Sequence, residues 1–149
     1  MSDFNLDDFL PYQVAELSRR MSAGFERHYR ARFGISVAEW RVVAHLSQQA
    51  AVSVREIHER VGMDKPKVSR AASRLEENGY VTKQVNTADR RLVELSLTPK
   101  GQQMIEVLAP IAAAYQRELD AALGDEAAAF RAQLAKLTAT LAAQARSKR

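Results

Sequence analysis

The spacing of the apolar residues changes along the chain between a helical and an alternating period. From Pro11 to about Phe33, apolar side chains recur every three or four residues, which predicts a helix with one apolar face. That face carries Leu10, Val14, Leu17, Met21, Phe25 and Tyr29. A second helix is expected to open at Ser36, which forms a capping box with Glu39, and to run through Leu46.

Two further helices are predicted on either side of a glycine. Ser53 forms another capping box with Glu56 and opens a helix of about two turns that stops at Gly62. Asp64 then caps a longer helix, which ends at Asn78. Two helices joined by a tight turn that contains glycine have the spacing of a helix-turn-helix motif.

The pattern then becomes alternating, which predicts two strands. The first alternating run covers residues 80–85, and the second, residues 93–97, places its apolar side chains on one face. The polar stretch 86–90 separates the two runs. The pair is therefore predicted to be a β-hairpin with a charged tip.

Helical spacing returns after the hairpin and continues to the end of the chain. A long helix is expected to start at Pro99, to kink at Pro110 and to end at Leu123. The last helix follows Gly124 and carries an apolar stripe made of Phe130, Leu134, Leu137 and Leu141. This stripe needs a partner, which is either the first helix or a second copy of the chain.

The order of these elements predicts a mainly α fold with a small β-hairpin wing. Residues 36–98 form the predicted winged helix-turn-helix region, and residues 10–34 and 99–146 form a helical region available for dimerisation. A length of 149 residues suits a single domain, 1–149.

The positive charge is concentrated on the fourth predicted helix. The net charge is +4, and the run from Lys65 to Arg74 contains no acidic residue. A basic helix fits the major groove of DNA, and a thin hairpin fits the backbone or the minor groove beside it. A solvated basic face is the alternative interpretation of the same run.

The candidate DNA-binding residues lie on this helix, just before the preceding helix and at the hairpin tip. They are Ser53, Lys65, Pro66, Lys67, Ser69, Arg70, Ser73, Arg74, Asp89, Arg90 and Arg91. Lys65, Pro66 and Lys67 sit at a helix amino end, where backbone donors favour phosphate. Asp89 is expected to orient one of the two arginines that follow it by a charge-assisted hydrogen bond.

A small-molecule pocket is the second kind of site that the sequence predicts. Arg20, His28, Trp40 and Arg41 could line a site where an apolar wall meets a cation, as an aromatic carboxylate requires. The alternative is that Trp40 belongs to the core, the arginines make surface or interface pairs, and His28 is a buried and satisfied polar group.

Several function classes are excluded by what the sequence lacks. It has no cysteine, so disulfides, zinc–thiolate sites and thiol redox sensing are ruled out. Its histidines lack metal-site spacing, and none of the common catalytic motifs is present, so no metal, cofactor or enzymatic activity is expected. There is neither a signal peptide nor a long apolar segment, which favours a cytoplasmic protein without membrane contact.

Three motifs in this order resemble the MarR family. The run Asp89-Arg90-Arg91, followed by Leu97-Thr98 and Gly101, is similar to the wing signature of that family. The stretch from Gly62 to Arg70 resembles its recognition-helix entry, and the stretch from Gly34 to Arg41 resembles the start of its second helix. The resemblance covers about residues 10 to 145.

The resemblance implies a homodimer in which the first, fifth and sixth helices interlock and two winged domains bind the halves of a pseudo-palindromic operator on double-stranded DNA. It implies a repressor that is released by a small effector, such as an aromatic carboxylate or its coenzyme A thioester, in a cleft beside the dimerisation helices. It also favours Arg91 as the residue inserted at the wing. The missing cysteines set this chain apart from the thiol-sensing branch of the family.

Two other classes of function remain compatible with the residues. One is a helical interaction or architectural protein without a ligand response, in which the basic helix is merely solvated. The other is an enzyme whose site has no recognisable motif. Salt-dependent and sequence-dependent binding to duplex DNA separates the first from a regulator. The enzyme would need turnover that survives the loss of Arg70 and Arg91.

Overall fold

The structure, a computed structural model, describes residues 3–148 in two compact units. The first unit runs to Ile111 and the second starts at Ala112, within one long helix, and each is described by itself. In chain order the elements are η1 (Leu6–Asp8), α1 (Leu10–Phe33), α2 (Val37–Leu46), β1 (Val52–Ser53), α3 (Val54–Val61), α4 (Lys65–Glu77), β2 (Val81–Val85), β3 (Val93–Leu97), α5 (Pro99–Leu123), η2 (Gly124–Glu126) and α6 (Ala127–Ser147).

The predicted caps set the helix boundaries. The side chains of Ser36, Ser53 and Asp64 each accept a hydrogen bond from a backbone N–H three residues later, which satisfies a donor that the helix itself leaves free. Gly62 ends α3 with φ 69°, a left-handed conformation that glycine adopts without a steric penalty. The turn between α3 and α4 therefore follows directly from the sequence.

The wing belongs to a three-stranded antiparallel sheet with the order β1-β3-β2. The hairpin of β2 and β3 is as predicted, but the short edge strand β1 was missed. Its two residues, Val52 and Ser53, pair with Leu95 and Glu94 of β3. A strand of two residues leaves no alternating pattern to read, and Ser53 had already been explained as a helix cap.

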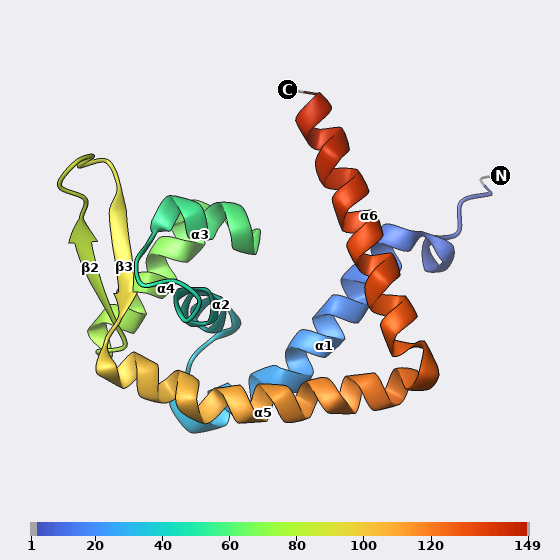
Figure 1. Cartoon of the computed structure of the whole chain (residues 1–149), viewed down its shortest axis with the longest axis horizontal. Helices are drawn as coiled ribbons and strands as arrows, with labels where there is room; N and C mark the ends of the chain where they lie inside the picture. Colours follow the sequence, from blue (N-terminus) through green and yellow to red (C-terminus); the bar gives the residue numbers. More distant parts are fainter. Residues whose placement is uncertain (1–2, 149) are drawn as a thin grey trace. The chain divides into compact units, whose positions relative to one another are not determined.

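The recognition helix α4 packs its apolar side against α2 and α3 in the first unit (Figure 1). Val68, Ala71, Ala72 and Leu75 are buried on that side. Their spacing of three and four leaves the opposite side of the same helix to solvent. The amphipathic pattern thus decides that the basic residues of α4 point outward.

The start of α5 is fixed to the turn that precedes the wing. The hydroxyl of Thr98 donates to the carbonyl of Gly79 at 2.5 Å and accepts from the backbone N–H of Gly101 at 3.1 Å. Thr98 therefore caps α5, and the predicted helix start at Pro99 is confirmed. The helix continues through Pro110 to Leu123.

An aromatic cluster joins α1 to α2. Tyr29 is 0% exposed and stacks on Trp40 with ring centroids 5.5 Å apart, and Phe25 packs edge-on against both. The Tyr29 hydroxyl is buried without a hydrogen-bond partner among the described residues. Burial, with a smaller contribution from Glu26, raises the pKa of Tyr29 to about 12.

We expect the Tyr29→Phe variant to be as stable as the parent at neutral pH or more stable, because it removes a buried polar group that makes no hydrogen bond. The raised pKa keeps the folded phenol neutral while the unfolded one ionises above about pH 10. The parent should therefore lose about 2 to 3 kcal/mol between pH 10 and 12 from this group.

Denaturant unfolding of both proteins at several pH values measures this effect as a difference. The free energy of unfolding of the Tyr29→Phe variant should fall less steeply above about pH 10 than that of the parent. Ionisation of the other tyrosines and of the lysines affects both proteins equally and cancels in the difference. A neutral-pH loss above about 1 kcal/mol would instead show that the hydroxyl has a hydrogen bond worth keeping.

The second unit consists of the end of α5, η2 and α6. Arg131 of α6 donates to the carboxylate of Asp120 on α5 at 2.5 Å, which ties the two helices together. No described residue of α6 is buried, and its large apolar side chains are exposed: Phe130, Leu134, Leu137 and Leu141. None of the described helices combines the length and apolar character that a membrane span needs.

Candidate nucleic-acid interface

The outward side of α4 presents the predicted basic surface. Lys65, Lys67, Ser69 and Arg70 are exposed, and so is Pro66 in the first turn. Asp64 caps the helix by accepting from the backbone N–H of Lys67 at 2.9 Å. The amino end of α4 thus combines exposed side-chain cations with the positive end of the helix dipole, an arrangement that favours phosphate.

Two of the predicted contacts on α4 already have partners inside the protein. Ser73 is half-buried and accepts a hydrogen bond from Lys83 of β2 at 2.8 Å. Arg74 lies 3.6 Å from the carboxylate of Glu39, which is 5% exposed and also accepts from the Ser36 hydroxyl. These partners hold α4 against the wing and against α2. Ser73 and Arg74 are therefore less available than Arg70 for a contact with DNA.

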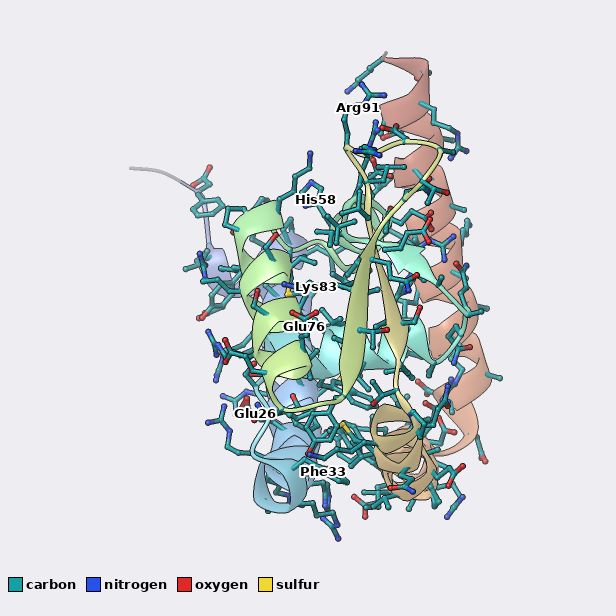
Figure 2. The ribbon with its side chains drawn as sticks, turned by 90° about the vertical axis from the view of Figure 1, so that its left-hand side faces the viewer. Glu26, Phe33, His58, Glu76, Lys83 and Arg91 are labelled. Carbon is teal, nitrogen blue, oxygen red and sulfur yellow. The ribbon has the colours of Figure 1, made fainter. Side chains whose placement is uncertain are left out.

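Lys83 connects the wing to the recognition helix. Its ammonium group lies 3.9 Å from Glu76 in addition to its hydrogen bond with Ser73 (Figure 2). The side chain occupies the same face of β2 as the buried Val81. In the sequence, a lysine between two valines on one face of this strand indicates that the face packs against polar side chains.

The wing tip is built around the pairing of Asp89 with Arg91. The guanidinium of Arg91 donates two hydrogen bonds of 3.0 Å to the two carboxylate oxygens, and its backbone N–H adds a third. These bonds lower the pKa of Asp89, so the carboxylate stays ionised. The Arg91 side chain is nevertheless 90% exposed, at the far end of the wing (Figure 2). As the sequence predicts, Asp89 orients an arginine.

Asn86 braces the tip from inside. Its amide oxygen accepts from the backbone N–H groups of Ala88 and Asp89, and its amide nitrogen donates to Glu94 of β3 at 2.5 Å. The loop therefore holds Arg91 in a defined place. Sequence reasoning had treated this stretch only as a polar turn and did not assign Asn86 a role.

The remaining predicted residues differ in accessibility. Arg90 is exposed beside Arg91. Ser53 is 7% exposed and its hydroxyl accepts from the backbone N–H of Glu56. The structure thus accounts for Ser53 by the cap and the sheet edge, and we do not retain it among the DNA contacts.

A pocket of about 490 Å³ lies where α3, α4 and the wing meet, and we call it the junction pocket. It is lined by Val54, Arg55, Lys65, Ser69, Ala72, Lys83, Asp89, Arg91, Leu92 and Val93. Four of these residues were predicted as DNA contacts, Lys65 and Ser69 on α4 and Asp89 and Arg91 at the wing, and the other six were not. Among those six, Arg55 and Lys83 bring charge. Only the folded chain places them beside Lys65 and Arg91.

The residues predicted for a ligand pocket do not form one cluster. Arg41 lines a cavity of about 610 Å³ between α1 and α2, together with Arg19 and Glu26, and Arg20 is not part of it. Arg41 also lines a second cavity of about 470 Å³, which it shares with Trp40. His28 is half-buried beside the ring of Phe25 and lines neither cavity.

Comparison with known proteins shows which protein family shares this arrangement of helices and wing. The family model of the MarR family matches residues 33–92, which hold the helix-turn-helix and most of the wing. The chain is 36% identical over 110 residues to the HTH-type transcriptional repressor MdtR of Bacillus subtilis, a match that covers 73% of this chain and 68% of MdtR. The chain belongs to the MarR family.

Solved structures of the family extend the similarity beyond the matched segment. A MarR/EmrR family transcriptional regulator from Acinetobacter sp. ADP1 superimposes with a TM-score of 0.81 at 28% identity, over 97% of this chain and 99% of that one. BpsR of Bordetella bronchiseptica, whose DNA binding is regulated by 6-hydroxynicotinic acid, shares the fold with a TM-score of 0.77 at 20% identity over 93% of this chain and 98% of BpsR.

Membership in the MarR family decides the class of function. This MarR protein is a transcriptional regulator and not an enzyme. The predicted resemblance and the predicted winged fold are both confirmed. Among residues 3–148, no group of three or more potential metal ligands comes together.

Proposed function

We propose that this protein is a homodimeric, cytoplasmic repressor that binds a pseudo-palindromic operator through α4 and the wing and leaves it when a small aromatic acid binds. The observation that carries the proposal is the exposed basic side of α4, within the acid-free run from Lys65 to Arg74, beside a wing tip whose arginine is held in place by Asp89. The similarity to MdtR, a repressor, supports the direction of regulation.

The geometry of the first unit supports different roles for the exposed residues of α4 and the wing on the DNA. Arg70 and Ser69, exposed in the second turn of α4, are placed to contact base edges in the major groove. Lys65 and Lys67, at the amino end of the helix, are placed to hold phosphates. Arg91 at the wing tip would enter the adjacent minor groove or hold its backbone.

Dimerisation is supported by apolar side chains that the single chain leaves exposed. In α1, the residues Leu10, Val14 and Leu17 are each more than two-fifths exposed, and α6 exposes the whole apolar stripe named above. Exposed stripes of this kind on helices mark surfaces that another chain covers. We therefore retain 10–34 and 99–146 as the dimerisation region and 36–98 as the DNA-binding region.

Selection of binding sites from a pool of randomised duplexes tests the DNA part of the proposal. We expect the parent protein to enrich an inverted repeat whose half-sites are centred about one helical turn apart. The Arg70→Ala variant should lose enrichment at defined base positions while it keeps weak binding to any duplex. Failure of the parent to enrich any sequence would contradict operator recognition and favour a protein that only packs against other proteins.

The effector is proposed to bind beside Arg41. Arg41 lines two cavities, one of them together with Trp40, and each is large enough for a substituted aromatic ring. An arginine next to an aromatic wall suits an aromatic carboxylate, which needs both a cation and apolar surface. The regulation of BpsR by 6-hydroxynicotinic acid, an acid of this class, supports the choice.

We expect the Arg41→Ala variant to bind the selected operator as the parent does, but to need at least about tenfold more of an active aromatic acid for release. A thermal-shift screen of aromatic acids and their coenzyme A thioesters finds that acid first, because ligand binding stabilises the folded protein. His28→Ala serves as the comparison, since His28 lines neither cavity. An equal loss of operator binding and release in Arg41→Ala would count against a ligand contact.

A further inference from the structure

The junction pocket contains two cations, Arg55 and Lys83, to which the proposed DNA contacts assign no role. Four cations from four different segments line it: Arg55, Lys65, Lys83 and Arg91. Asp89 is the one acidic residue among its lining residues, all of which the structure describes. The lining therefore carries a net charge of +3, four cations less one carboxylate. Its floor is apolar, formed by residues such as Val54, Leu92 and Val93.

The position of the pocket on DNA follows from the shape of the duplex. The major and minor grooves are separated by a single sugar–phosphate strand. With α4 in the major groove and the wing at the adjacent minor groove, that strand has to cross between them. The junction pocket is lined by both α4 and the wing, so it lies on the path of the crossing strand.

The four cations are not equally free to meet a phosphate. Arg91 is held by Asp89, and Lys83 is held by Ser73 and Glu76. Arg55 makes one ion pair, with Glu59 at 3.7 Å, in which both side chains are more than three-fifths exposed. An exposed pair of this type on one helix contributes little to stability, so it costs little to exchange.

Lys65 complements Arg55 from the other side of the pocket. It is exposed in the first turn of the thirteen-residue α4, where the helix dipole favours an anion. Arg55 lines the pocket together with Asp89, which places it near the wing tip. Its charge adds to the larger effect of the hydrogen bonds from Arg91 in lowering the pKa of Asp89. A phosphate between the two elements would thus meet one cation from α3 and one from α4.

We propose that the junction pocket holds one backbone phosphate of the bound duplex in each protomer, and that Arg55 is a phosphate-binding residue acting with Lys65. This inference rests on the proposed DNA binding. It adds α3 to the interface, through a residue that neither the basic run of α4 nor the wing signature indicates. The role is sequence-independent, since a phosphate carries no base identity.

Binding to a mixed-sequence duplex of about 30 base pairs, titrated with salt, tests the assignment. Arg55→Gln should make the negative slope of log affinity against log salt less steep by about 1 per protomer, as expected for one lost phosphate contact. Near physiological salt the affinity should fall about three- to tenfold, and equally for the selected operator and the mixed duplex. Arg55→Lys should keep most of the slope.

Arg60→Gln is the matched control, because Arg60 is exposed on the last turn of the same helix and does not line the pocket. It should keep the slope of the parent, and the thermal midpoints of all variants should agree. Equal slopes for Arg55→Gln and the parent would overturn the phosphate site, as would equal reductions in Arg55→Gln and Arg60→Gln. Salt-independent binding by the parent would instead overturn the proposed DNA binding itself.

Discussion

Replacing Arg91 by alanine is expected to weaken binding to the selected operator at least about tenfold, while the oligomeric state stays that of the parent. The guanidinium is 90% exposed, so it contributes little to the packing of the wing. In the free protein it is already oriented by two hydrogen bonds to Asp89. Orientation before binding reduces the ordering cost that a flexible arginine would incur on the DNA.

The measurement is operator affinity by fluorescence anisotropy at physiological salt, with oligomeric state followed by light scattering. Arg60→Ala is the control for loss of a charge, because Arg60 is an exposed residue of α3 that does not line the junction pocket. Asp89→Asn keeps the Arg91 charge but weakens its anchor, so its loss should be smaller. Parent-like affinity of Arg91→Ala would remove the wing tip from the interface.

A second large effect is expected from Gly101→Ala, in the first turn of α5. A Cβ at this position would lie 2.2 Å from the carbonyl oxygen of Tyr80, a backbone atom that also accepts a hydrogen bond from Thr98. Because a carbonyl held in this way cannot move aside alone, α5 and the base of the wing must separate. We expect a loss of about 3 kcal/mol or more.

Thermal unfolding at a fixed protein concentration measures this loss, which corresponds to a fall in Tm of roughly 6 to 12 °C. Gly124→Ala is the comparison, since its Cβ would meet nothing within 4 Å and only the positive φ of 62° is unfavourable. Its loss should be about 1 to 2 kcal/mol. A Gly101→Ala variant within 2 °C of the parent Tm would show that the junction rearranges easily.

The helices and their boundaries could be predicted because the signals for them are local. Ser36, Ser53 and Asp64 act on backbone groups three residues away, and glycine turns need no distant contact. The alternating runs of β2 and β3 lie next to each other in the sequence and pair directly. The edge strand β1 was not predicted, since two residues define a strand only through a distant partner.

The residues of the candidate site can be divided in the same way, into those that local signals indicate and those that only the fold brings together. The exposed cations of α4 and the pairing of Asp89 with Arg91 lie within one helix and one loop, so sequence spacing indicates them. The partners of Ser73 and Arg74 come from β2 and α2, and the cations of the junction pocket come from four segments. Spacing along the chain carries no information about which of these segments meet.

The sequence by itself determined the order of helices and strands, the basic side of α4 and the family, because periodicity, caps and short motifs act over a few residues. The tertiary structure alone decided that Arg74 faces a buried carboxylate, that Lys83 joins the wing to α4, and that Arg55 lines a basic pocket. Those relations depend on how the helices and the sheet pack together, and packing brings together side chains from segments far apart in the chain, as with Glu39 and Arg74.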